Sequence, residues 1–224
     1  FVSAKVRNCR TMVRRNDPEP PKDLLGRMSR LAKKAETSKT MASLLGTEGA
    51  AAQAYFSRFD SMLKTDVDDF GFEGRRKRPP PDPVNAVLSY VYGVLTKELF
   101  VTLLTVGFDP YMGFFHQPRY VRPALALDLM EEFRPLVADS TTLTLFNNGE
   151  LSGEDFITTP GGVTLTAKAR KKLIRAYERR IGDEIKHPLF GYRVSYRRVM
   201  EVQARLLARV LYGEIDNYPP FTTR

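Results

Sequence analysis

The stretch from Pro83 to Val106, PVNAVLSYVYGVLTKELFVTLLTV, lies in the most apolar part of the chain. Proline is favoured in the first turn of a helix, and the apolar run that follows is long enough for several turns. Lys97 and Glu98 interrupt the run near its middle, where charged side chains would be costly in lipid. The stretch therefore predicts a long buried helix that reaches the surface once, and no membrane span.

Apolar residues at helical spacing predict further helices on both sides of this one. In the first segment Val2, Val6, Cys9 and Val13 recur at that spacing among basic residues, and Pro18 ends the pattern. Similar patterns predict helices from Leu24 to Ala35, from Met41 to about Leu63, from Pro123 to about Ala138, from Thr166 to Ile181 and from Tyr196 to Val210. Turn residues flank β-prone runs between 147 and 165, which favours a small β-hairpin there. The predicted fold class is therefore mainly α, a multi-helix domain with one possible hairpin.

The segment at about 66–83 differs from the rest because it has no periodicity. It is first acidic, then carries Arg75-Arg76-Lys77-Arg78, and ends in a triple proline. Such composition is typical of an exposed loop. The length of 224 residues suits one large domain or two small ones, and we expect one domain spanning residues 1–224.

Charge and cysteine content narrow the class of protein. The formal net charge of +9 indicates a polyanionic partner such as nucleic acid or a membrane surface, although a generally basic soluble protein remains an alternative. Cys9 is the only cysteine, so an intrachain disulfide and a thiolate metal cluster are both excluded, and a cytoplasmic setting fits best. Since the chain begins directly in a helical pattern at Phe1, we expect it to be a piece of a longer polypeptide.

Carboxylates in the predicted helix after Pro123 are candidates for a metal site. Asp128 and Glu131 stand three residues apart and share one helix face, whereas Glu132 is rotated partly away. Their neighbours are strongly apolar, so a buried position is expected for Asp128. Two buried carboxylates on one face repel each other unless a cation offsets their charge.

Two more residues are candidates for the same site. Glu48 precedes a run of small residues that would allow close approach of another backbone or of a DNA strand, although an isolated glutamate is more often simply exposed. His116 lies in an aromatic loop before the acidic helix, where its alternative is a partly buried loop histidine. Carboxylates with one imidazole and no thiolate suit Mg²⁺ or Mn²⁺ better than zinc. His187 precedes a proline in another loop and receives no role.

Basic residues gather in the loop and on the last two predicted helices. Two basic helices in succession favour contact with phosphates, although each alone could be a solvated face. The candidate nucleic-acid-binding residues are Arg75, Arg76, Arg78, Lys171, Lys172, Arg175, Arg193 and Arg197. Some tyrosines could stack on unpaired bases, although aromatic residues at such positions more often belong to the core. They are Tyr90, Tyr92, Tyr111, Tyr120 and Tyr192.

Several motifs together resemble one family. These are Arg78-Pro79-Pro80-Pro81-Asp82-Pro83-Val84-Asn85-Ala86, Gly107-Phe108-Asp109-Pro110 with Phe115-His116, Leu125-Ala126-Leu127-Asp128-Leu129-Met130-Glu131-Glu132-Phe133-Arg134-Pro135, Thr47-Glu48-Gly49-Ala50-Ala51-Ala52 and Gly161-Gly162-Val163-Thr164-Leu165-Thr166. The chain is similar over nearly its whole length to CRISPR-associated protein one, the integrase family of spacer acquisition.

The resemblance implies a metal-dependent DNA integrase and endonuclease. Glu48, His116 and Glu131 would bind Mg²⁺ or Mn²⁺, with Asp128 beside them as a further catalytic residue. A DNA 3′-hydroxyl would attack a phosphodiester of the CRISPR repeat and insert a short foreign DNA, or spacer.

It also implies partners. These are double-stranded DNA with single-stranded 3′ ends, the repeat and leader DNA, and a small ferredoxin-like CRISPR-associated dimer. Family members carry an N-terminal β-rich domain that helps dimerisation and is absent from this chain, so a homodimer is expected of the full-length protein.

Two other functions remain open at this point. In the first, the chain is a catalytically silent DNA-binding scaffold whose acids cap helices or pair with surplus arginines. In the second, it is a basic protein-interaction module with no affinity for DNA at moderate salt. Metal binding at Glu48, His116 and Glu131 would separate the enzyme from both alternatives.

Overall fold

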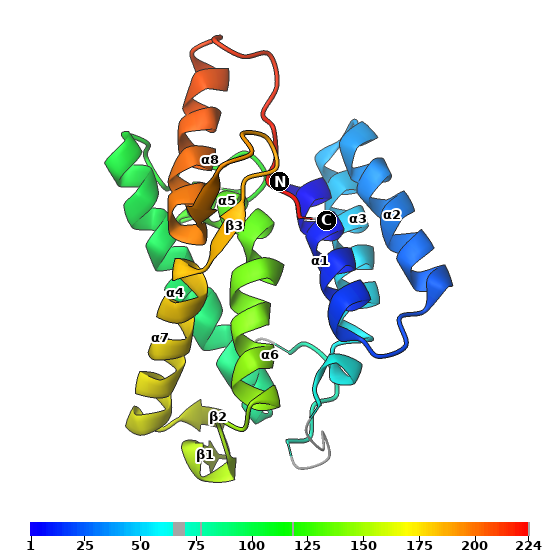
Figure 1. The fold of residues 1–224 in the computed structure, drawn as a ribbon, viewed down its shortest axis with the longest axis vertical. Helices are drawn as coiled ribbons and strands as arrows, with labels where there is room; N and C mark the ends of the chain where they lie inside the picture. Colours follow the sequence, from blue (N-terminus) through cyan, green and yellow to red (C-terminus); the bar gives the residue numbers. More distant parts are fainter. Residues whose placement is uncertain (65–69, 77, 118, 224) are drawn as a thin grey trace.

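The chain folds into helices joined by turns, two long loops and two small hairpins (Figure 1). The computed structural model describes residues 1–64, 70–76, 78–117 and 119–223. Its helices are α1 (Val2–Asn16), α2 (Lys22–Thr37), α3 (Met41–Phe56), α4 (Pro83–Val106), α5 (Ala124–Phe133), α6 (Ser140–Asn147), α7 (Ala167–Gly182) and α8 (Tyr196–Leu211). Its strands are β1 (Phe156–Thr159), β2 (Gly162–Leu165), β3 (Glu184–Lys186) and β4 (Arg193–Ser195). The prediction of a mainly α fold is confirmed.

Helix α4 is the central element of the larger helical layer. The Asp82 side chain caps its start by accepting from the backbone N–H of Asn85 at 2.7 Å, and Gly107 ends it in the left-handed conformation. The helix is long and apolar enough to cross a membrane by length and composition alone. In the fold it packs against α5, α6, α7 and α8, as the apolar pattern predicts for a buried helix.

Helices α1, α2 and α3 form a second layer, which α1 joins to the first (Figure 1). Helix α1 packs against α2 and α3 and also against α5. The C-terminal tail binds to α1 where the two layers meet. Asn8 donates to the backbone oxygen of Phe221 and accepts from the N–H of Thr223. The ring of Phe221 stacks on Phe133 at 5.6 Å between centroids. Both termini therefore lie at the seam between the two layers.

The helix predicted from Pro123 to about Ala138 is interrupted and longer than expected. Helix α5 ends at Phe133, residues Arg134–Asp139 form a π-helical turn, and α6 continues to Asn147. Pro135 has no N–H, so the α-helical bond to the carbonyl of Glu131 cannot form there. The wider turn keeps the helix going beyond the proline instead of ending it.

Other predicted boundaries also change. Helix α3 ends at Phe56, well before the predicted Leu63, and only a 3₁₀ turn, η1 (Asp60–Met62), follows. A cluster of aromatic rings causes the change of direction, since Phe59 packs on both Phe56 and Phe72. The hairpin predicted between 147 and 165 is confirmed as β1 paired antiparallel with β2, after a 3₁₀ turn at Gly153–Asp155. The second hairpin, β3 with β4, was not predicted.

The segment predicted as an exposed loop at about 66–83 is partly packed. Residues 66–69 and Lys77 lie outside the described residues. The prediction is wrong for Phe72, which is buried, and for Arg75, which is half-buried. Asn85 holds this part of the loop on α4, because its side chain donates to the carbonyl of Gly74 and accepts from the N–H of Arg76.

Candidate functional site

Two of the predicted site residues, Glu48 and Glu131, meet at the ammonium group of Lys5. Glu48 comes from the middle of α3, Glu131 from the last turn of α5, and Lys5 from α1. The Lys5 Nζ lies 2.6 Å from Glu131 Oε2 and also pairs directly with Glu48 Oε1. The lysine side chain is 7% exposed and that of Glu131 is 4% exposed. Two carboxylates from separate helices thus share one buried cation.

Glu131 has a second cationic partner in Arg134. The Arg134 Nη1 lies 3.1 Å from Glu131 Oε1 and 3.3 Å from Oε2. Burial opposes ionisation of Glu131, but Lys5 and Arg134 outweigh it and lower the pKa of this carboxyl to about 2. Burial likewise acts against the charged form of Lys5, yet the two glutamates raise its pKa above the usual value. The cluster is therefore charged and internally paired.

Asp128 and His116 form a second pair. The Asp128 carboxylate is fully buried and accepts from the backbone N–H groups of Phe114, Phe115 and His116 at 2.6, 2.9 and 2.8 Å. The same carboxylate lies 2.6 Å from the Nδ1 of His116. A histidine held in this way by a carboxylate has its Nε2 left for another ligand. Asp128 therefore positions the loop and the imidazole, and its catalytic role beside the metal stays a prediction.

The donor set fits a divalent cation, although the described residues are not arranged as a complete metal site. Glu48, His116 and Glu131 line one groove, and two carboxylates with a carboxylate-bound imidazole suit Mg²⁺ or Mn²⁺. Among the described residues, however, no three His, Cys, Asp or Glu side chains converge as metal ligands. Lys5 takes the position between the two glutamates instead. The metal role of the three residues stays a prediction.

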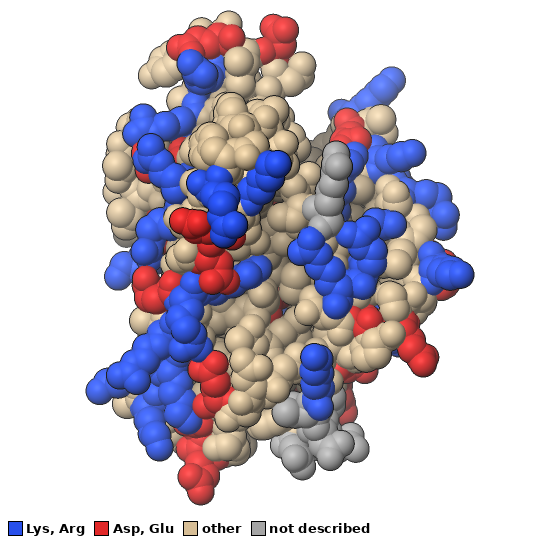
Figure 2. All heavy atoms as spheres, in the orientation of Figure 1, with Lys and Arg blue, Asp and Glu red and all other residues tan. Residues whose placement is uncertain are grey.

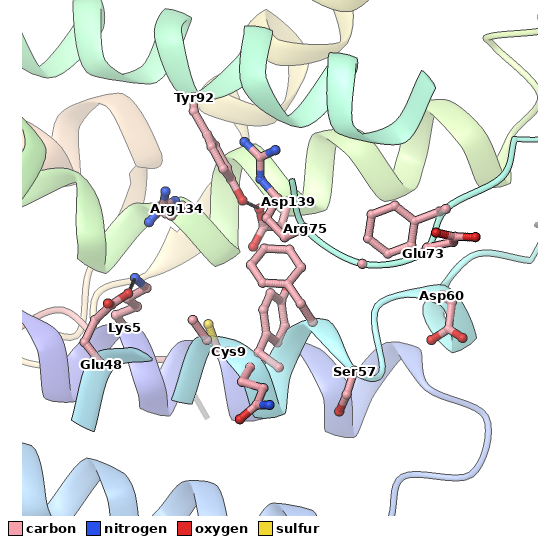
Figure 3. A pocket seen from close by; sticks show the side chains of 16 residues that line it. Lys5, Cys9, Glu48, Ser57, Asp60, Glu73, Arg75, Tyr92, Arg134 and Asp139 are labelled. Atoms are coloured by element: carbon pink, nitrogen blue, oxygen red, sulfur yellow. Dashed lines mark hydrogen bonds and ion pairs between the residues drawn. The ribbon is translucent and has the colours of Figure 1, made fainter. Parts of the chain in front are cut away.

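The wall opposite Lys5 is built around Tyr92 from α4 (Figure 3). The Tyr92 hydroxyl donates to Asp139 at 2.6 Å, and the Arg134 guanidinium lies over its ring at 4.3 Å from the centroid. Burial raises the pKa of Asp139 above its ordinary value. These residues, with Lys5 and Glu48, line a cavity of about 550 Å³, the Tyr92 pocket. The π turn places both Arg134 and Asp139 on this pocket.

A larger groove of about 930 Å³ adjoins the Tyr92 pocket and shares Glu48, Tyr92 and Arg134 with it. We call it the arginine groove, because Glu48, His116 and Glu131 lie in it together with Arg75, Arg78, Arg119, Arg122 and Arg134. At its rim Tyr120 is 99% exposed, on a tight turn closed by pairing of Arg119 with Arg122 and by a positive φ at Val121. The concentration of guanidinium groups suits binding of phosphates.

Sequence reasoning missed part of this site. Arg119 and Arg122 follow His116 closely in the sequence, and this proximity could have marked them as residues of the same site. The sequence does not single out Lys5 as a site residue, because it is one of several basic residues on the first helix. Among the tyrosines considered for base stacking, Tyr120 is exposed in the groove, whereas Tyr92 is buried.

The predicted nucleic-acid-binding residues fall into two groups. Arg75 and Arg78 line the arginine groove, although Arg75 turns inward to Asn85 and Ser89. The other six, Arg76, Lys171, Lys172, Arg175, Arg193 and Arg197, line neither cavity. Figure 2 shows basic side chains gathered over α7, where Lys171 and Arg175 are exposed. Lys172 pairs with Asp155, Arg193 with Glu184, and Arg197 with Glu98 and Glu178. The structure thus places two of the eight at the candidate site.

A family model, two curated relatives and one solved structure that match this chain all describe or contain the same kind of protein. The model of the family described as CRISPR associated protein Cas1 matches residues 1–179. A CRISPR-associated exonuclease Cas4/endonuclease Cas1 fusion of Geobacter sulfurreducens is 50% identical over the whole chain, which spans 42% of that relative. A CRISPR-associated endonuclease Cas1 of Thermus thermophilus is 43% identical over the whole chain, which spans 65% of it. A solved Cas6-RT-Cas1–Cas2 complex is 25% identical with a TM-score of 0.83, over 100% of this chain and 24% of the solved one.

Proposed function

Because the chain belongs to the CRISPR associated protein Cas1 family, we propose that it carries the catalytic site of a metal-dependent DNA integrase and endonuclease. The curated relatives named above are endonucleases or endonuclease fusions. The observation that carries the proposal is the convergence of Glu48 and Glu131 on one cation position, in the arginine groove that also contains His116.

In this proposal Glu48, His116 and Glu131 hold Mg²⁺ or Mn²⁺, which when bound supplies positive charge for a non-bridging oxygen of the target phosphate. Asp128 keeps His116 in place and orients its ring. Arg134 holds the Glu131 carboxylate through contacts with both of its oxygens. Arg119 and Arg122 bind phosphates of the strands along the groove.

The reaction is a phosphoryl transfer between DNA strands. A 3′-hydroxyl of the incoming spacer attacks a phosphodiester of the repeat strand in line, and the new P–O bond replaces the bond to the departing 3′-oxygen. With water in place of the 3′-hydroxyl, the same site hydrolyses DNA. The role of the protein's residues is chiefly to position the two strands and to neutralise charge.

The partners proposed are those of the family. They are double-stranded DNA with single-stranded 3′ ends, the CRISPR repeat and leader, and a small ferredoxin-like dimer. The solved complex similar to this chain contains Cas1 with Cas2, which supports such a protein partner. We propose a homodimer for the full-length protein and a cytoplasmic site of action in a prokaryotic cell.

One observation favours the rival function, a catalytically silent DNA-binding scaffold. Glu48 and Glu131 are already paired with Lys5 and Arg134, as they would be if their role were structural. The scaffold and the enzyme both predict DNA binding that weakens with salt. Only the enzyme predicts strand transfer that depends on a divalent cation and on the two glutamates.

A strand-transfer assay tests the proposal. The intact protein is assayed with its partner, Mn²⁺ and labelled spacer DNA, beside the variants Glu48→Ala, His116→Ala and Glu131→Ala. We expect each variant to lose strand transfer while retaining DNA binding, because the arginines of the groove remain. The exposed Glu154→Ala variant is the matched control and should remain active. Full strand transfer by Glu131→Ala or Glu48→Ala would contradict the assigned metal site. Absence of metal-dependent strand transfer in the unchanged protein, with DNA binding retained, would support the scaffold instead.

A further inference from the structure

Lys5 is a buried lysine whose ammonium group pairs with two of the candidate metal ligands, Glu48 and Glu131. Buried lysines are rare unless they are paired, and this one lies with Nζ between carboxylates from α3 and α5. The contact with Glu131 is 2.6 Å, and the contact with Glu48 is equally direct. Its ammonium group therefore occupies the point where the two carboxylates of the proposed metal site converge.

A divalent cation and this ammonium group cannot share that point. Mg²⁺ requires oxygen ligands at about 2.0–2.1 Å, so a metal bound by both Glu48 and Glu131 would lie where Nζ now lies. Moving the lysine only slightly would leave two cations in near contact in a buried site, where repulsion is screened poorly. The charges of the four paired side chains also sum to zero, since Lys5 and Arg134 balance Glu48 and Glu131.

A neighbouring cavity offers space for the ammonium group if it leaves the two carboxylates. Lys5 lines the Tyr92 pocket, a cavity of about 550 Å³ that also contains the buried carboxylate of Asp139 (Figure 3). Lysine has a flexible four-carbon stem and no fixed donor geometry, so its head can swing within such a space. Arg134, in contrast, is held by Glu131 and by the face of Tyr92.

We propose that Lys5 is a built-in competitor for the metal site: it holds Glu48 and Glu131 together in the metal-free protein and is displaced when a divalent cation binds. This inference rests on the proposed metal site and adds a residue that regulates its occupancy. The lysine keeps two carboxylates from repelling each other before metal arrives. It also weakens metal binding, because the metal must break two buried ion pairs.

Calorimetric titration of the intact protein with Mn²⁺ tests the competition. We expect Lys5→Met to bind Mn²⁺ at least about tenfold more tightly than the unchanged protein, because the competing ion pairs are absent. Without metal the variant should melt at a lower temperature, and Mn²⁺ should raise its melting temperature more than that of the unchanged protein. Lys33→Met, which removes the same charge from an exposed position on α2, should change neither measurement.

The possible results distinguish failure of the competitor role of Lys5 from failure of the metal site. If Mn²⁺ binds the unchanged protein through Glu48 and Glu131, but Lys5→Met binds it equally or more weakly, the competitor role is wrong and the metal site stands. If the unchanged protein binds no Mn²⁺, or Glu131→Gln binds it unchanged, the metal site itself fails and the competitor role fails with it.

A structure of the unchanged protein with Mn²⁺ gives an answer that does not depend on the variant folding. In the loaded site, Nζ should no longer lie within hydrogen-bond distance of both carboxylates. A metal ion bound by Glu48 and Glu131 with Nζ still between them would overturn the proposal.

Discussion

The Asp128 carboxylate determines the shape of the loop that presents His116. Three consecutive backbone N–H groups, from Phe114 to His116, donate to it, and both oxygens are used. The loop has no helix or strand of its own at these residues, so this carboxylate replaces the bonds that regular structure would provide. The position of the imidazole therefore depends on a residue of α5, twelve positions along the chain.

The variant Asp128→Asn tests this dependence. One oxygen becomes an amide nitrogen, which cannot accept from the backbone, so at least one N–H group loses its partner. We expect the free energy of unfolding to fall by about 1–3 kcal/mol. Amide hydrogen exchange at residues 114–116 should also become faster. Asp109→Asn is the control, because that side chain is exposed and accepts from the N–H of Tyr111. Equal, small effects in both variants would contradict the anchoring role.

Glu132 gives a prediction for the pH dependence of stability. Burial raises the pKa of this carboxyl from 4.5 to about 7, although Gln203 and the N–H of Phe221 donate to it. The Glu132 carboxyl therefore loses its proton at a lower pH in the unfolded chain than in the folded chain. The stability that the neutral carboxyl contributes is complete below about pH 4.5 and is lost as pH rises through about 7.

The variant Glu132→Gln should remove this dependence. It resembles the neutral carboxyl and stays uncharged, so it should be more stable than the unchanged protein at pH 8 by up to about 3 kcal/mol. The advantage should disappear near pH 4.5. Denaturant unfolding at both pH values measures it, with the exposed Glu154→Gln as control. An advantage that is the same at both pH values would show that Glu132 does not titrate in this way.

The resemblance to one family marks the positions of Glu48, His116, Asp128 and Glu131. The structure places three of them in one groove and Asp128 against His116, while their catalytic and metal roles stay a prediction. Lys5 could not be found, because its importance comes from contacts with residues 43 and 126 positions away. Helical periodicity assigns a residue to a face but does not say what lies opposite.

Among elements, the long apolar helix and the first hairpin were predicted because their patterns are local. Helix α4 has a proline in its first turn and a glycine after its last, and its start and end agree with the prediction. The end of α3 was not predictable, since contacts between aromatic rings of separate segments, Phe59 and Phe72, turn the chain there. The second hairpin was missed because its strands have only three residues each.

Gly113 fixes the approach of the His116 loop to α5. A Cβ at this position would lie 2.7 Å from the Cβ of Ala124 and 2.9 Å from the carbonyl oxygen of His116. Gly113→Ala should therefore push the loop from the helix, lower the free energy of unfolding by about 1–3 kcal/mol and reduce strand transfer. Gly46→Ala is a control, since an added Cβ meets nothing within 4 Å there and should stabilise α3 by about 0.5–1 kcal/mol. Unfolding curves and strand-transfer rates of the two variants distinguish the cases.

At the scale of the whole molecule, net charge predicted a polyanionic partner but not the surface that binds it. The arginine groove collects residues from the loop before α4, from the turn after His116 and from the π turn. Such a surface exists only after folding. The basic run on α7 is evident in the sequence, yet it lies outside both cavities.

The double variant Arg119→Ala/Arg122→Ala tests the groove as the DNA-binding surface. If each guanidinium contacts one phosphate, the slope of log affinity against log salt should fall by about 1 for each arginine removed. Fluorescence anisotropy with labelled duplex at several salt concentrations measures the slope. The exposed Arg30→Ala on α2 serves as the control. An unchanged slope would direct attention to α7 as the principal contact.

The π turn at Arg134–Asp139 sets the rotation of α6 relative to α5. A π-helical turn contains more residues than an α-helical one, and each residue of an α-helix turns the chain by about 100°. Deleting one residue here would let the two helices join in phase, and it would rotate the buried Leu143 and Phe146 away from the core. Arg134 and Asp139 lie at the two ends of this turn, and both line the Tyr92 pocket. The spacing between these two residues is therefore more constrained than the identity of the residues between them, and changes in length should be tolerated less well than substitutions.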